Sequence, residues 1–191
     1  MKMDHSLEGH YFLKPAVLLL FFISLFFLSF VLYWRQAHTF TSEIIVEHIQ
    51  ELSNIFEKIN EDCGILSFEH QKNYIDFLTV KSFVGSEVGS MNLTYPDKWQ
   101  GPYLNDNPTV QEKYYQVVRT QGGHYIVPGE GVILHNGKKI GEDILFDEDV
   151  DIEALIADKT LQYQGQPLAA RIAVAGESHR LAQSAMFDEA E

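Results

Sequence analysis

The sequence predicts an α+β protein in which a long N-terminal helix packs on a small antiparallel β-sheet. Two observations predict the helix: an apolar run at residues 15–34, and the absence of Gly and Pro from residue 16 up to Gly64. A third predicts the sheet. Short segments rich in aromatic and β-branched residues, separated by turns that contain glycine, follow from residue 114.

The apolar run, PAVLLLFFISLFFLSFVLYW, has the length of a membrane-spanning helix. At about 1.5 Å per residue it reaches roughly 30 Å, the thickness of the hydrocarbon core of a bilayer. Only Ser24 and Ser29 interrupt it, and Tyr33 and Trp34 stand where an aromatic belt meets the membrane surface. The alternative is a cleaved signal peptide, but its apolar region is usually only about 7–15 residues and ends at a small-residue cleavage site.

Charge predicts the orientation of this span. Lys2 and Lys14 precede the run, whereas Arg35 is the one basic residue that closely follows it. Because basic residues near a span stay in the cytoplasm, we expect residues 1–14 to be a short cytoplasmic N-terminus. The expected location is the bacterial inner membrane, with a single pass at 15–34 and a C-terminal domain in the periplasm.

The composition also excludes classes of partner. The chain has 27 acidic and 14 basic residues, a net charge of −13, and only Asp4 and Glu8 among the acids precede the apolar run. A domain this negative repels nucleic acid but attracts divalent cations. We therefore expect no nucleic-acid partner, and no small-molecule substrate is evident. The expected partners are the lipid bilayer and other membrane subunits.

An amphipathic helix is predicted at residues 35–63. Its apolar residues recur at spacings of 4, 3, 4 and 3, which places them on one face: Ile45, Ile49, Leu52, Phe56 and Ile59. We expect this helix to continue the membrane span as one rod, with Gly64 in the C-cap position. The alternative is a break at residues 38–42, where Thr and Ser favour helix caps. Our hypothesis is that the apolar face covers the sheet and also contacts a neighbouring helix.

An α+β globular domain is predicted at residues 64–160, followed by a partly disordered C-terminal extension at 161–191 that could add a strand or two. Within the domain we expect a short helix at 73–81 and another at 152–158. The predicted strands are 114–120 with 124–128, joined through Gln121–Gly123, and 132–134 with 139–140. Asn136-Gly137, between the last two, is the pair favoured in a two-residue type I′ turn.

Few residues indicate chemistry. The sequence contains no nucleophile elbow, zinc-protease motif, P-loop or dinucleotide fingerprint, so we expect no enzymatic activity and assign no catalytic residue. Cys63, the only cysteine, is expected to be a buried apolar residue. Asp147, Asp149 and Asp151 alternate in a loop and could offer oxygen ligands to calcium, although the pattern is not that of an EF-hand; the alternative is a solvated acidic turn. No other cofactor is expected.

The most specific string in the chain is Lys98 to Leu104, KWQGPYL. It resembles the W-x-G-P-Y-L segment of the major pseudopilin of bacterial type II secretion systems. That resemblance implies a pilin-like fold, in which a long N-terminal helix leads to the motif, then to a small antiparallel sheet and a calcium-binding loop. Pro102 would fix a turn, and Trp99 and Tyr103 would hold the loop against the helix, with Gly101 and Leu104 completing the packing motif.

The N-terminus departs from the pattern that the resemblance implies. Prepilins have a Gly at the cleavage site and a Glu five residues into the mature chain. Gly9 is the only candidate processing site here; His10 would follow it, and Lys14 would occupy the position of the Glu. The charge is reversed, which counts against conventional filament assembly.

The sequence therefore predicts a membrane-anchored, pilin-like structural component of a secretion or pilus-type assembly, acting in protein transport. The alternative from another class is an anchored periplasmic binding or accessory module unrelated to filaments. A membrane-tethered hydrolase is the third candidate, and no catalytic constellation supports it.

Overall fold

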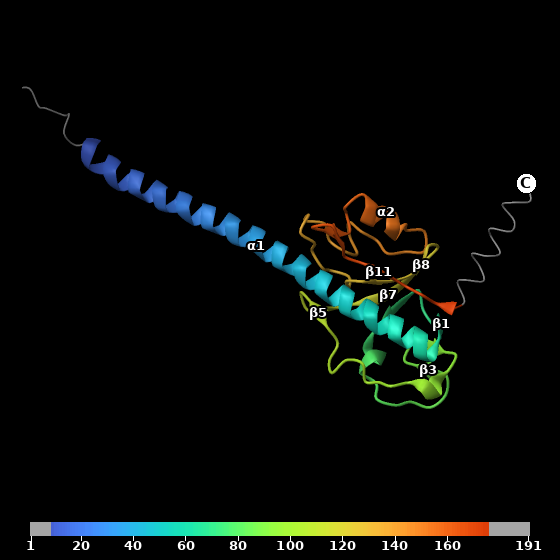
Figure 1. Cartoon of the computed structure of the whole chain (residues 1–191). Helices are drawn as coiled ribbons and strands as arrows, with labels where there is room; N and C mark the ends of the chain where they lie inside the picture. Colours follow the sequence, from blue (N-terminus) through green and yellow to red (C-terminus); the bar gives the residue numbers. More distant parts are fainter. Residues whose placement is uncertain (1–8, 176–191) are drawn as a thin grey trace, which may run out of the picture. The chain divides into compact units, whose positions relative to one another are not determined.

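The computed structural model describes the backbone of residues 9–175 and the side chains of residues 17–33 and 40–175. The chain forms two compact units, Met1–Thr39 and Phe40–Glu191. Helix α1 (Gly9–Cys63) begins in the first unit and ends in the second (Figure 1). Residues 38–42, where the alternative placed a break, are assigned to this helix.

The first unit contributes only the N-terminal part of α1. Its described side chains, residues 17–33, are all exposed. Among the described residues, no helix combines the length and the hydropathy that are needed to cross a membrane. The predicted span at 15–34 lies partly outside the described side chains, as does Lys14.

The second unit contains the core. From Phe40 onward α1 presents one buried face, and this face joins a single apolar cluster with residues from the surrounding strands and loops. Antiparallel sheets pack on this part of the helix, drawn in cyan in Figure 1. The α+β class and the packing of a long N-terminal helix on antiparallel sheets are thereby confirmed.

The central sheet has four antiparallel strands in the order β11-β8-β7-β2. Its bounds are β2 (Lys72–Tyr74), β7 (Gln116–Thr120), β8 (Gly123–Val127) and β11 (Ala170–Ile172). The hairpin β7–β8 pairs Thr120 with Gly123, so the turn is shorter than the three residues expected. Every residue of β8 is buried, as expected for a strand with a neighbour on each side.

Smaller elements surround this sheet. A second sheet has the order β1-β4-β3, from β1 (Ile65–Phe68), β3 (Glu87–Val88) and β4 (Met91–Leu93). Two hairpins are β5 (Thr109–Val110) with β6 (Lys113–Tyr114), and β9 (Gln162–Tyr163) with β10 (Gln166–Pro167). The helical turns are η1 (Asp76–Thr79), η2 (Pro96–Lys98) and α2 (Ile152–Ala157).

Helix α1 ends where the sequence predicts. Gly64 has a φ of 66°, a left-handed conformation that favours glycine. Its amide donates to the Asn60 carbonyl at 3.0 Å, and the Asn60 side chain accepts from the Ile65 amide at 3.0 Å. These bonds turn the chain directly into β1.

Three local predictions are wrong. Residues 73–81 form no α-helix, because Lys72–Tyr74 pairs with β7 and only the single turn η1 follows. Segments 132–134 and 139–140 make one bridge, Ile133 to Lys139, in place of a two-stranded ladder. The turn between them has three residues. The Leu134 carbonyl accepts from the Gly137 amide, and the Leu134 amide donates to the Lys138 carbonyl. Of the three turn residues only Gly137 has a positive φ, so the turn is not type I′.

The domain also extends beyond residue 160. Strand β11 forms an edge of the central sheet, and Leu161, Leu168 and Ile172 belong to the core. The predicted boundary at 160 therefore falls too early, and residues 161–172 are part of the domain. Val174 also belongs to the core, and residues 176–191 of the predicted extension lie outside the described residues.

Candidate functional site

The apolar face of α1 is used entirely inside its own chain. Ile45, Leu52 and Ile59 have no exposed surface, and Ile49 and Phe56 have 2% each. Phe56 meets Phe68 of β1 and Phe77 of η1 edge-on, with ring centroids 6.3 and 6.1 Å apart. The hypothesis that these five side chains also contact a neighbouring helix is wrong, because 2% or less of each residue remains exposed.

The opposite face of the same helix is acidic. Its exposed positions include Glu43, Glu47, Glu51, Glu57 and Glu61. Lys58 is the only Lys or Arg between residues 40 and 63. Like charges repel at this spacing, so the face is poorly suited to close packing against a copy of itself.

Apolar side chains surround the helix at residues 17–33. Apart from Ser24 and Ser29, every residue here is a large apolar or aromatic one, and its exposure lies between 39% at Val31 and 75% at Phe26. A helix that is apolar on all sides is stable only where something apolar covers it, in a protein core or in lipid. This segment is the largest exposed apolar surface in the described part of the chain.

The KWQGPYL loop lies at the C-terminal end of α1. Trp99 donates from Nε1 to the Val80 carbonyl at 3.0 Å and packs edge-on against Phe83 and Tyr103, with centroids 5.5 and 4.8 Å apart. The Tyr103 and Leu104 amides both donate to the Leu78 carbonyl. The loop is thus attached chiefly to residues 78–83.

Tyr103 approaches the helix. The Lys58 ammonium lies 6.0 Å from the centre of the Tyr103 ring. Burial raises the pKa of both Tyr103 and Cys63, so both stay protonated. Cys63 is fully buried and makes no disulfide, in line with the prediction.

Gly101 and Pro102 are constrained by this loop. A Cβ at Gly101 would lie 2.4 Å from both the Trp99 Nε1 atom and the Val80 carbonyl oxygen, so no other residue fits beneath their hydrogen bond. The Gly101–Pro102 peptide bond is cis. The motif residues therefore act together as a packing unit, with the glycine required by the closeness of the indole.

The three aspartates of the acidic loop do not form a common site. Asp147 accepts from the Asp149 amide at 3.2 Å, Asp149 accepts from Gln121 at 2.8 Å, and Asp151 caps α2 by accepting from the Ala154 amide at 2.9 Å. No group of three or more His, Cys, Asp or Glu side chains in the described residues is placed to hold a metal ion. The loop's carboxylates serve local structure.

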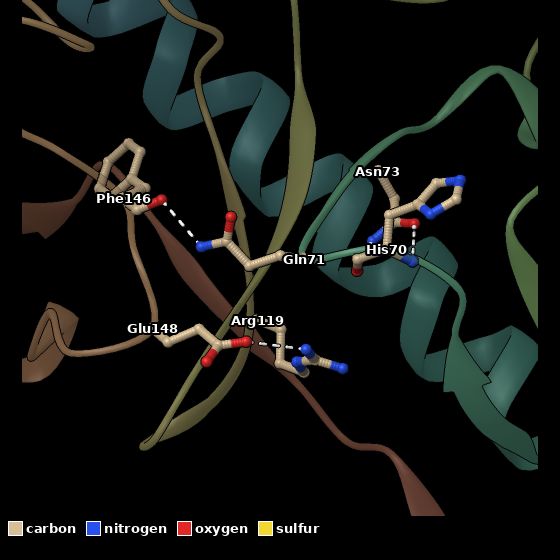
Figure 2. A network of polar contacts seen from close by, with 6 residues as sticks. All are labelled: His70, Gln71, Asn73, Arg119, Phe146 and Glu148. Carbon is tan, nitrogen blue, oxygen red and sulfur yellow. Dashed lines mark hydrogen bonds and ion pairs between the residues drawn. The ribbon is translucent and has the colours of Figure 1, made fainter.

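The same loop is attached to the central sheet. Arg119 of β7 bonds to Glu148 at 2.8 Å, and the Gln71 side chain donates to the Phe146 carbonyl at 3.2 Å (Figure 2). Beside them, the Asn73 side chain accepts from the His70 amide and donates to the His70 carbonyl. The loop is thereby held by two elements far apart in the sequence.

One cavity was not predicted. About 430 Å³ in volume, it lies beside β2 and β6 and is lined by Tyr74, Ile75, Asp76, Asn107 and Tyr114. Sequence reasoning missed it because its residues come from segments more than thirty positions apart. The sequence offers one indication of this cavity, the two tyrosines Tyr74 and Tyr114, which end strands β2 and β6.

Gly9, the candidate processing site, is the first residue of α1, and its neighbours 1–8 lie outside the described residues.

Comparison with known proteins adds no identification: no family model matches the chain, and neither a curated protein nor a solved structure matches it.

Proposed function

We propose that this protein is a membrane-anchored, pilin-like structural component of a secretion or pilus-type assembly. Residues 15–34 insert in the inner membrane, the N-terminus stays in the cytoplasm, and the acidic domain stands in the periplasm. Its function is lateral association with other membrane subunits, and the proposal includes no catalytic step.

The observation that carries the proposal is the apolar surface at residues 17–33. Burial of apolar area is favourable by roughly 25 cal/mol per Å², so fifteen exposed large side chains strongly favour transfer out of water. Both serines in this segment can bond to carbonyls of the preceding turn, which lowers the cost of inserting them in lipid.

The rest of the chain supports a pilin-like arrangement. One long helix has an apolar N-terminal part and a second part covered by small antiparallel sheets, and the KWQGPYL loop follows in the order that the pseudopilin resemblance implies. The acidic outer face of residues 40–63 disfavours close contact there. We therefore assign lateral contacts to residues 17–33 within the bilayer.

The first test measures membrane association of the full chain. Phe26 and Phe27 are changed together to Arg, which costs about 5 to 7 kcal/mol for insertion at the centre of a span. The unchanged chain should resist extraction by alkaline carbonate, and the variant should be released. Leu66→Arg, at an exposed apolar position of the domain, is the control and should remain in the membrane.

A second measurement separates a structural subunit from an isolated anchored module. Ser29→Cys and Glu51→Cys are crosslinked in membranes, where Cys63 is buried and inert. We expect crosslinked multimers from Ser29→Cys and none from Glu51→Cys. Retention in the membrane without any crosslinks would favour the binding or accessory module, and carbonate extraction of the unchanged chain would overturn the anchor itself.

A further inference from the structure

We propose that Asn136 is a site of spontaneous deamidation, which the native fold keeps closed and which reacts when the chain around Thr160 moves away. Asn136 and Gly137 belong to the turn between Leu134 and Lys138, and both are exposed, so water reaches them. Gly137 has a φ of 80°, and no neighbouring atom lies within 4 Å of the position that a Cβ would take. The site belongs to the second unit alone, so the proposal does not depend on membrane anchoring.

The pair Asn136-Gly137 sets the chemistry. The Gly137 backbone nitrogen gives up its proton to hydroxide and attacks Cγ of Asn136. The new N–C bond closes a succinimide ring as the Cγ–Nδ2 bond breaks, and the nitrogen leaves as ammonia after taking a proton from water. Water then opens the ring at either carbonyl, which yields aspartate or isoaspartate. Glycine favours the attack because it has no Cβ to obstruct the approach, and water is the only co-reactant.

Two hydrogen bonds keep the reaction from starting in the native fold. The Gly137 amide donates to the Leu134 carbonyl at 2.9 Å, which retains the proton that must leave. The Asn136 Nδ2 atom donates to the Thr160 carbonyl at 3.0 Å, which retains the leaving nitrogen. A third bond acts in the other direction: the Lys138 amide donates at 3.1 Å to Oδ1 of Asn136, on which negative charge develops during the attack. The turn is therefore prepared for the reaction, and the first two bonds prevent it.

The bond to Thr160 depends on the connection between α2 and β9. Thr160 is 7% exposed, and its amide donates to Oδ1 of Asp158 at 2.8 Å. The Lys138 ammonium donates to the Thr160 hydroxyl at 3.2 Å. Asp158 itself is exposed, so water competes for the contact that positions Thr160. Movement of this connection releases the side chain of Asn136.

The same turn contacts α1. Nδ1 of His135 lies 3.3 Å from Oγ of Ser42, and the His135 ring packs edge-on against Tyr163 of β9. A chain in which the helix is not docked loses this support of the turn and should react. Aspartate or isoaspartate at position 136 cannot donate to the Thr160 carbonyl. The reaction therefore makes the opening permanent and marks the chains in which it occurred.

The first test compares the folded and unfolded full chain at pH 8, the former in a non-ionic detergent and the latter in concentrated urea. Mass spectrometry of the tryptic peptide that ends at Lys138 measures conversion of Asn136. We expect conversion in urea and a rate at least about tenfold lower in the folded chain, as for amides that exchange only through local opening. Equal rates would show that the fold does not close the site, and no conversion in urea would show that there is no site.

A pair of matched variants tests the contact that positions Thr160. Asp158→Ala removes the acceptor of the Thr160 amide, whereas Asp158→Asn keeps an oxygen in its place. Circular dichroism selects conditions in which both are folded. Conversion of Asn136 should be several-fold faster in Asp158→Ala than in Asp158→Asn, and the two rates should be equal in urea. Equal rates in the folded variants would overturn the assignment of Thr160 as the closing group.

A second pair tests the consequence of the reaction. Asn136→Asp reproduces one product, and Asn105→Asp adds the same charge at an exposed loop position. A lost hydrogen bond of about 1 kcal/mol lowers the melting temperature of a chain of this size by about 2–4 °C. We expect this decrease in Asn136→Asp and not in Asn105→Asp. Equal melting temperatures in the two variants would contradict a permanent opening of the turn.

Discussion

At the scale of single residues, polar side chains fix the position of α1 against its own domain. Ser42 Oγ lies 3.3 Å from Nδ1 of His135, and Glu43 accepts from the Tyr163 hydroxyl at 3.4 Å. Further along the helix, the His48 ring bonds to the buried Tyr115 hydroxyl at 3.1 Å. Apolar burial alone would allow the helix to slide or rotate, whereas these pairs specify one register.

Among these residues, His135 makes the stability dependent on pH. Burial lowers its pKa, because the surroundings disfavour the charged ring. Its ring also packs edge-on against Tyr163 at 5.1 Å. In the unfolded chain the ring takes up a proton near pH 6.5, so the unfolded state binds more protons below that value. Its contribution to stability is therefore complete above about pH 6.5 and is lost as the pH falls below it.

We predict that His135→Gln reduces this loss. The melting temperature, followed by circular dichroism between pH 7.5 and 5.5, should fall less in the variant than in the unchanged chain. His70→Gln is the control, because the His70 side chain is 63% exposed, and it should retain the original pH profile. Identical profiles for His135→Gln and the unchanged chain would contradict the assignment.

At the scale of elements, the buried face of α1 is the main contribution of the helix to stability. Leu52 has no exposed surface and lies midway along this face. Leu52→Ala removes buried methyl groups and leaves a cavity, so we predict a loss of about 2–5 kcal/mol in the free energy of unfolding. Urea titration monitored by circular dichroism measures it.

Asn54 provides the matched control on the same helix. Its side chain is exposed, so Asn54→Ala should change the free energy of unfolding by no more than about 0.5 kcal/mol. Similar midpoints for the two variants would contradict the view that one face of the helix carries the core.

The helix was predictable because its signals are local. The apolar period from Ile45 to Ile59 and the glycine at 64 depend only on residues close in sequence. Strand β2 could not be predicted in this way, because Lys72–Tyr74 contains no strand-forming pattern. It is ordered by pairing with β7, more than forty residues later. The cavity at Tyr74 and Tyr114 escaped prediction for the same reason.

The motif residues illustrate the limit in another way. Trp99 and Tyr103 were expected to attach their loop to the helix. A seven-residue string does not show which segment of the chain each aromatic side chain contacts. The structure pairs Trp99 with Val80 and Phe83 and brings Tyr103 to α1. Likewise the alternating aspartates suggested convergence on one ion, but each carboxylate is used by a different neighbouring amide.

At the scale of the whole molecule, the core lies entirely within the second unit. Among the side chains of α1 that the structure describes, the first buried one is Ser42. We predict that a fragment of residues 40–191 folds with the melting temperature of the full chain, whereas a fragment of residues 65–191, which lacks the helix, does not fold. Circular dichroism and thermal melting of both fragments measure this. A folded 65–191 fragment would show that the sheets need no helix.

The pairing of β11 with β8 has a consequence for synthesis. The apolar face of α1 is made first, and the core that covers it includes Ile172, one of the last described residues. At translation rates of about 5–20 residues per second, that face remains without its complete cover for roughly 6 to 25 s. During this interval the nascent chain exposes an amphipathic helix whose apolar face is open to non-native contacts, until the edge strand β11 is released and completes the core.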